Sequence, residues 1–102
     1  MDLVIESINK YIKNFGSKHL VLHRSIIPSS TFKAYKKFCY TLWLIDGKEK
    51  YSMFTLEDTR RVTSDTEEKV KEGFEQEFLI ELIKYCIEKL NLRDIQWSKI
   101  YK

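Results

Sequence analysis

An Asp-Gly pair at residues 46–47 stands between two runs that are rich in β-branched and aromatic residues. The runs cover residues 32–45 and 48–56. Asp-Gly between such runs predicts a β-hairpin, because a type I′ turn needs positive φ at both central residues. A turn on this pair sets a register: Ile45 opposite Lys48, Trp43 opposite Lys50, Leu42 opposite Tyr51, Tyr40 opposite Met53 and Cys39 opposite Phe54.

The rest of the chain predicts one further strand and flanking helices. Apolar residues recur at helical spacing from Val4 to Phe15, with Asp2 as the start cap and Gly16 just past the end. Residues 19–27 alternate between apolar and polar, which predicts a strand that Pro28 stops.

The C-terminal helix is predicted over residues 64–90, and a capping box of Ser64 and Glu67 would open it. Its apolar side turns acidic toward the N-terminus, so either the first turns overhang the core or the helix breaks near Gly73. A helical glycine costs ~1 kcal/mol relative to alanine. We therefore expect two pieces, 64–72 and 74–90. The tail that holds Trp97 fits either a short fourth strand or a final helical turn.

These elements give the order α-β-β-β-α(α). We expect an α+β fold: a three-stranded antiparallel sheet with an N-terminal helix and one long or broken C-terminal helix packed on one face. A chain of 102 residues predicts one domain, 1–102, and 43% hydrophobic with 32% charged residues is a globular composition.

The two cysteines and the N-terminus indicate a cytoplasmic location. Cys39 and Cys86 lie in apolar runs without a CxxC or histidine neighbour, which favours buried reduced thiols, although a disulfide between them stays open. The first 15 residues are amphipathic and carry Asp2 and Glu6, unlike a signal peptide, and no run is long enough to span a membrane.

The predicted hairpin carries large apolar residues on both faces. The face expected under the helices holds Phe38, Tyr40, Leu42, Leu44, Tyr51 and Met53. The second face holds Tyr35, Cys39, Trp43, Ile45 and Phe54 among Lys33, Lys37, Thr41, Lys48, Lys50 and Ser52. Three interpretations remain: the Trp97 tail or the 57–63 loop covers it, it binds a protein, or its rings and ammonium groups bind single-stranded nucleic acid.

Charge is unevenly spread along the chain. Residues 57–81 hold 9 acidic and 4 basic residues, a net charge of −5, whereas the whole chain has +3. The acids are either a solvated helix face that complements the helix dipole or a patch that docks on a basic protein surface. The candidate docking residues are Asp65, Glu67, Glu68, Glu72 and Glu75. Arg60 and Arg61 form a second small basic point beside the lysines of the hairpin.

No pattern in the sequence supports catalysis, a metal or a cofactor. His19 and His23 would lie ~13 Å apart on a strand, too far to share one ion. The chain has no nucleophile elbow and no glycine-rich phosphate loop. We therefore expect a protein that is not an enzyme, with no metal and no cofactor.

The element order resembles that of two kinds of protein. Double-stranded-RNA-binding domains share it but need lysines at the start of the last helix, where this chain reads SDTEEKVKE. In size and element order the chain also resembles some small phage-encoded inhibitors, including certain anti-CRISPR proteins, and the acidic segment 57–81 has a matching physical role. Usage rich in Lys, Ile and Glu is typical of AT-rich genomes.

These observations favour a small protein-binding module, an inhibitor or adaptor of phage or mobile-element type that acts by covering a partner's surface. Its acidic helical segment would dock on a basic, nucleic-acid-handling protein. A second contact face would hold Tyr35, Lys37, Trp43, Lys48 and Lys50. The alternative is a single-stranded nucleic-acid binder that uses the aromatic and lysine face of the 32–56 hairpin.

Overall fold

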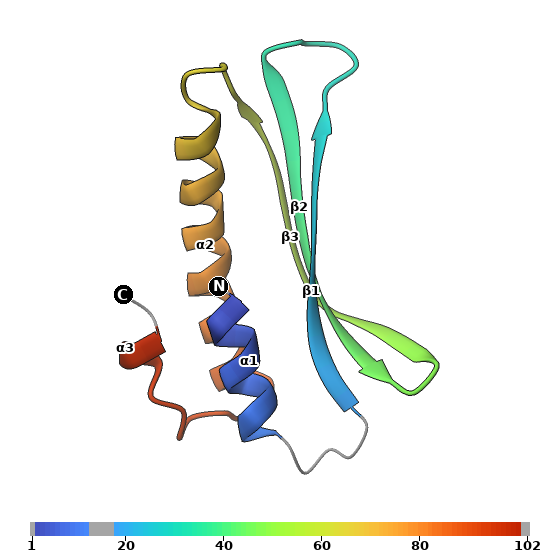
Figure 1. Ribbon diagram of the computed structural model, residues 1–102, viewed down its shortest axis with the longest axis vertical. Helices are drawn as coiled ribbons and strands as arrows, with labels where there is room; N and C mark the ends of the chain where they lie inside the picture. The colour runs from blue at the N-terminus through green and yellow to red at the C-terminus, as the bar shows by residue number, and fades with distance from the viewer. Residues whose placement is uncertain (1, 13–17, 101–102) are drawn as a thin grey trace.

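A computed structural model describes residues 2–12 and 18–100 of the chain. Helix α1 (Asp2–Tyr11) is followed by strands β1 (Lys18–Pro28), β2 (Tyr35–Asp46) and β3 (Glu49–Arg61), then by helices α2 (Glu67–Glu88) and α3 (Trp97–Ile100). The strands form an antiparallel sheet in the order β1-β2-β3, and the helices lie on one side of it (Figure 1). This arrangement confirms the predicted α+β fold and its element order.

The core lies between the helices and one face of the sheet. Strand β2 is the central strand, and alternate residues Phe38, Tyr40 and Leu42 are fully buried on that face. They meet Phe74 and Phe78 of α2: the Tyr40 ring lies edge-on to both, at centroid distances of 4.9 and 5.6 Å. Edge-to-face aromatic pairs add ~0.5–1.5 kcal/mol each beyond the area they bury.

The first helix closes the other side of the core. Val4, Ile5 and Ile8 are buried, as the helical spacing predicts. The side-chain amide of Asn9 then joins α1 to β1, because its Nδ2 donates to the Leu20 carbonyl (3.0 Å) and its Oδ1 accepts from the Leu20 N–H (2.7 Å). The predicted cap at Gly16 lies outside the described residues.

The hairpin exists, but its predicted register is wrong. The two-residue loop is Gly47 and Lys48, so that Asp46 pairs with Glu49, Ile45 with Lys50 and Trp43 with Ser52. Gly47 has φ +62°, the positive φ that a type II′ turn requires at its first central position. A β-bulge then shifts the pairing once more, so that Leu42 lies opposite Phe54.

The bulge also changes which side chains reach the core. Phe54, predicted on the second face, packs on Phe78 and Tyr85 of α2 at 5.3 and 5.4 Å between ring centroids. A β-bulge bends the strand that carries it, and the hairpin end turns away from the helices (Figure 1). Tyr51 lies in this end and is 49% exposed, although the sequence predicts it in the core.

Helix α2 is continuous, so the predicted break at Gly73 is wrong. It spans 22 residues from Glu67 to Glu88 without interruption. The buried stripe runs through Phe74, Phe78, Leu82 and Cys86, and Gly73 faces solvent. The capping box is also wrong, because Thr66 precedes the first helical residue and Glu67 instead pairs with Lys36.

The C-terminal tail returns to the core as a helical turn and not as a fourth strand. Trp97 begins the short helix α3, and its indole Nε1 donates to the Leu92 carbonyl at 3.1 Å. Ile95, Trp97 and Ile100 pack against the core, on the helical side of the molecule. Of the predicted loop 57–63, residues 57–61 belong to β3 and Val62 lies in the core, so neither this loop nor the described part of the tail, up to Ile100, covers the second face of the sheet.

Candidate functional site

The five predicted docking acids divide into two groups. Glu67 and Glu75 are bound within the chain: Glu67 pairs with Lys36 at 2.5 Å, and Glu75 pairs with Arg24 at 3.7 Å. Asp65, Glu68 and Glu72 are exposed, and within residues 2–12 and 18–100 no cation or donor binds their carboxylates. Only this second group can meet a partner without breaking an internal contact.

Glu75 has a structural role that accounts for its place near the core. The Tyr40 hydroxyl donates to Glu75 Oε1 at 3.1 Å. The Arg24 guanidinium forms ion pairs with the same Glu75 oxygen at 3.7 Å and with Asp2 Oδ1 at 2.6 Å. Burial of the phenol, and then the charge of Glu75, raise the pKa of Tyr40 well above its usual range. The four residues thus link α1, β1, β2 and α2 at the edge of the core.

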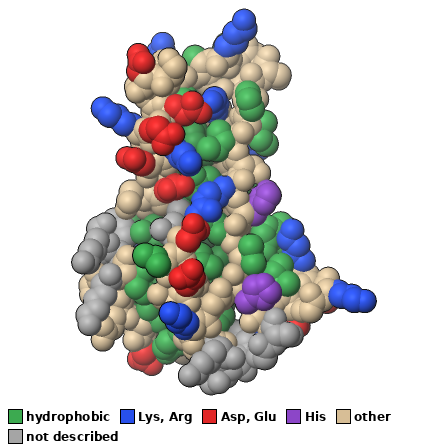
Figure 2. Space-filling model, in the orientation of Figure 1, with side chains coloured by type: hydrophobic (Ala, Val, Ile, Leu, Met, Phe, Trp, Pro, Cys, Tyr) green, Lys and Arg blue, Asp and Glu red, His purple; other side chains and the backbone are tan. Residues whose placement is uncertain are grey.

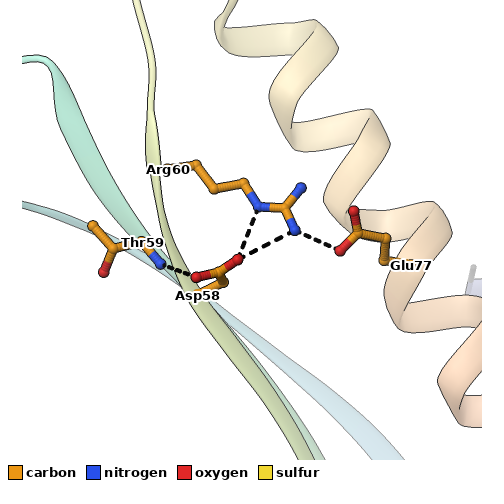
Figure 3. A network of polar contacts seen from close by, with 4 residues as sticks. All are labelled: Asp58, Thr59, Arg60 and Glu77. Carbon is orange, nitrogen blue, oxygen red and sulfur yellow. Dashed lines mark hydrogen bonds and ion pairs between the residues drawn. The ribbon is translucent and has the colours of Figure 1, made fainter.

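A second ionic contact holds α2 to β3 (Figure 3). Arg60 lies between Asp58 (3.4 Å) and Glu77 (2.5 Å), with its guanidinium 5.3 Å from the centroid of the Phe74 ring. The hydrogen bond to Glu77 raises the pKa of Arg60. In the sequence Arg60 appears only as a basic residue beside Arg61. The structure shows that its side chain joins β3 to α2 through Glu77.

Figure 2 shows acidic side chains gathered over α2, with lysines and arginines between them. Glu77 and Glu81 also belong to this helix, and they are paired with Arg60 and Lys84. Of the unpaired acids in and just before α2, Glu88 lies at the C-terminal end of the helix, whereas the other three lie in or just before its first turns, at the N-terminal end where the helix dipole favours negative charge. This end, with Asp65, Glu68 and Glu72, is called the acidic end of α2 below.

The second face of the sheet brings together most of the other predicted residues. Strand alternation places Tyr35, Lys37 and Trp43 of β2 on it, because Phe38, Tyr40 and Leu42 point into the core. Lys50 lies opposite Ile45, with its Nζ 4.2 Å from the centroid of the Trp43 ring. Lys48 lies apart from this group, in the exposed turn.

This second face is both basic and apolar. Lys37, Lys50 and Arg61 lie on it, while Glu57 pairs with Lys37 at 3.4 Å. Tyr35 is 36% exposed, and the neighbouring Val21 and Ile27 of β1 are 40% and 52% exposed. The Trp43 indole Nε1 is buried and has no partner among the described residues. The aromatic and lysine pattern of the sequence is therefore real, but Lys50 occupies one face of the Trp43 ring.

The cysteines are free and lie on opposite sides of the sheet. Cys86 is fully buried on the side of α2 that faces the core, and burial raises the pKa of its thiol to about 12. Cys39 lies on the second face and is half-buried. Neither cysteine forms a disulfide, and the predicted burial of the thiols is confirmed for Cys86 but not for Cys39.

The part of the chain that the structure describes holds neither a cluster of metal-binding side chains nor a helix that could span a membrane. No group of three His, Cys, Asp or Glu side chains gathers there in a way that could hold a metal ion. None of the helices in those residues is long and apolar enough to cross a membrane.

Comparisons with family models, with curated proteins and with solved structures gave no match to this chain.

Proposed function

We propose that this chain is a non-catalytic protein-binding module that docks the acidic end of α2 on a basic surface of a partner protein. The observation that carries the proposal is the division among the acids: Glu67 and Glu75 are bound internally, whereas Asp65, Glu68 and Glu72 have no partner in the described residues. Complementary fields between such an end and a basic groove raise the association rate and fix orientation.

The class of module that we propose is a small inhibitor or adaptor of the kind that phages and mobile elements encode, acting in the cytoplasm. The support is the resemblance in size and element order to such inhibitors, together with a segment of net charge −5 in a chain of net charge +3. A basic groove built for nucleic acid would be the matching target, because it presents the opposite charge at high density.

The test is an affinity pull-down of the tagged chain from a low-GC bacterial lysate, with and without nuclease, followed by titration of the purified partner. The variant Glu68→Lys with Glu72→Lys should weaken binding about tenfold or more and reduce its salt dependence. The matched control, Glu49→Lys with Glu88→Lys, makes the same charge change at exposed acids elsewhere. Equal effects of the two variants would contradict docking through this end.

The second candidate function is binding of single-stranded nucleic acid on the second face of the sheet. It is favoured by Lys37, Lys50 and Arg61 beside the Tyr35 and Trp43 rings. Fluorescence anisotropy with a labelled single-stranded oligonucleotide would detect it as binding that weakens steeply with salt. Lys37→Glu or Trp43→Ala should then abolish the signal, and recovery of partners only with intact nucleic acid would favour this candidate.

A further inference from the structure

Strand β1 is an edge strand, and the direction of its backbone groups can be read from two contacts. The Ser29 N–H donates to the Tyr35 carbonyl at 3.0 Å and so extends the ladder toward β2. In Leu20, by contrast, the N–H donates to Asn9 Oδ1 of α1 and the carbonyl accepts from Asn9 Nδ2, so both backbone groups point away from β2. Since successive residues of an antiparallel strand alternate in direction, Leu22, Arg24 and Ile26 also point their backbone groups away from β2.

This edge is open over three residues. Within residues 2–12 and 18–100, no other element bonds to the outward N–H and carbonyl groups of Leu22, Arg24 and Ile26. The strand pairs with β2 without a register shift over its whole length. An unbulged edge strand is a template for another strand.

The opposite edge, on β3, is bulged, whereas β1 is not. It carries the β-bulge near Met53, and its outward positions, alternate to the bonded Val62, include Glu57 and Arg61. Bulges and charged residues are the devices that keep a sheet edge from pairing. Strand β1 also has a charged outward residue, Arg24, but it is unbulged, so it is the edge more open to a second strand.

The apolar residues of β1 are arranged symmetrically about Arg24. Leu22 and Ile26 stand two residues before and after it, and Val21 and Ile27 stand three residues before and after it. Leu22 and Ile26 lie on the core side, whereas Val21 and Ile27 are exposed on the second face. A strand with this pattern is complementary to an antiparallel copy of itself.

We propose that two copies of this chain associate through β1, antiparallel, with the two Arg24 residues opposite each other. Leu22 then lies opposite Ile26 of the second copy, and Val21 lies opposite Ile27. The three outward-facing residues form three hydrogen-bonded pairs of two bonds each, about six in all. One continuous sheet runs through both copies.

The charges at the centre of this pairing are balanced within each copy. Arg24 contacts Asp2 at 2.6 Å and Glu75 at 3.7 Å, so each guanidinium brings its own counter-charges to the dimer axis. A face-to-face dimer through the second faces would instead bring together two surfaces that carry Lys50 and Arg61, and neither of these has an acidic partner among the described residues.

Helix α1 borders only part of β1, from Leu20 to Arg24. Asp2 at the start of the helix contacts Arg24, and Asn9 near its end binds Leu20. The helix therefore lies beside this half of the strand. The two-fold axis places the helix of the second copy beside the other half. Pairing ends where Leu20 meets Pro28, because Asn9 already binds Leu20 and proline has no N–H to donate.

The test is sedimentation velocity over a range of protein concentrations, which detects the dimer. Amide hydrogen exchange then shows which strand forms the interface. The wild-type chain should form a dimer, in which the amides of Leu22, Arg24 and Ile26 become protected as concentration rises. The outward amides of β3, such as those of Glu57 and Arg61, should not change. A chain that stays monomeric, or a dimer without this protection, would overturn the proposal, and pairing only with a strand of another protein would do so too.

A pair of variants tests the register. Val21→Lys with Ile27→Lys places like charges opposite each other at two symmetric positions and should weaken the dimer about tenfold or more. Val21→Lys with Ile27→Glu places opposite charges there and should restore most of the affinity. Both sites are exposed, so circular dichroism should show the same fold for both variants. Equal dimerisation of the two variants would contradict the proposed register. That outcome would leave the proposed docking through the acidic end of α2 unaffected.

Discussion

At the scale of single residues, neighbouring glutamates of one helix have different roles. Glu75→Ala should lower the free energy of unfolding by about 1–3 kcal/mol, because the buried Tyr40 hydroxyl loses its acceptor. Glu72→Ala removes an equal side chain from the exposed side of the same helix, and its effect should stay within about 0.5 kcal/mol. Urea denaturation measures both, and equal losses would show that Glu75 is not part of the core edge.

This difference between the glutamates could not be found in the sequence. The helical periodicity places Glu68, Glu72 and Glu75 alike on the apolar side of the helix, but Glu68 and Glu72 are exposed and only Glu75 contacts the core residue Tyr40. Its partners, Arg24 and Tyr40, come from two strands far away in the chain, and only their register brings them to the same oxygen. The Asn9 contact with Leu20 likewise has no local pattern that would predict it.

At the scale of elements, alanine substitutions at Gly73 in α2 and at Gly47 in the hairpin turn should change the stability of the protein in opposite directions. No atom lies within 4 Å of a Cβ added at Gly73 or at Gly47. Gly73→Ala should stabilise the protein by about 0.5–1 kcal/mol, because alanine favours the middle of a helix. Gly47→Ala should destabilise it by about 1–2 kcal/mol, since its φ of +62° disfavours a side chain.

Thermal or urea unfolding of the two variants would measure these effects. A loss of stability with Gly73→Ala would indicate that the helix needs a glycine there, as the predicted break at this residue requires. A gain with Gly47→Ala would contradict the positive φ of the hairpin turn.

The elements themselves were largely predictable, and their fine register was not. Alternation and helical spacing identified α1, the three strands and α2, since these patterns reflect burial on one side of each element. The turn type depends on which pair of residues forms the loop, and Asp46-Gly47 and Gly47-Lys48 are both compatible with a hairpin. The bulge beside Trp43 leaves no pattern in the sequence, so the positions of Phe54 and Tyr51 could not follow from alternation alone.

At the scale of the whole molecule, the two native cysteines report on the two faces of the sheet. Cys39 lies half-buried on the face that no described helix covers, whereas Cys86 of α2 is fully buried in the core. With its thiol pKa raised to about 12 by burial, Cys86 also holds almost no reactive thiolate near pH 8. A thiol reagent at that pH should therefore modify one cysteine per folded chain quickly, and the second only as fast as the protein opens.

Cys39→Ser is the matched control, because it should remove the fast phase and leave the slow phase unchanged. Denaturant should merge both phases into one, since the accessibility of Cys86 depends on global unfolding. Association through β1 should leave the fast phase intact at high protein concentration, because Cys39 belongs to the central strand and the edge pairing does not cover it. Slow modification of Cys39 in the monomer would mean that its face is covered, and it would exclude that face as a docking surface for protein or nucleic acid.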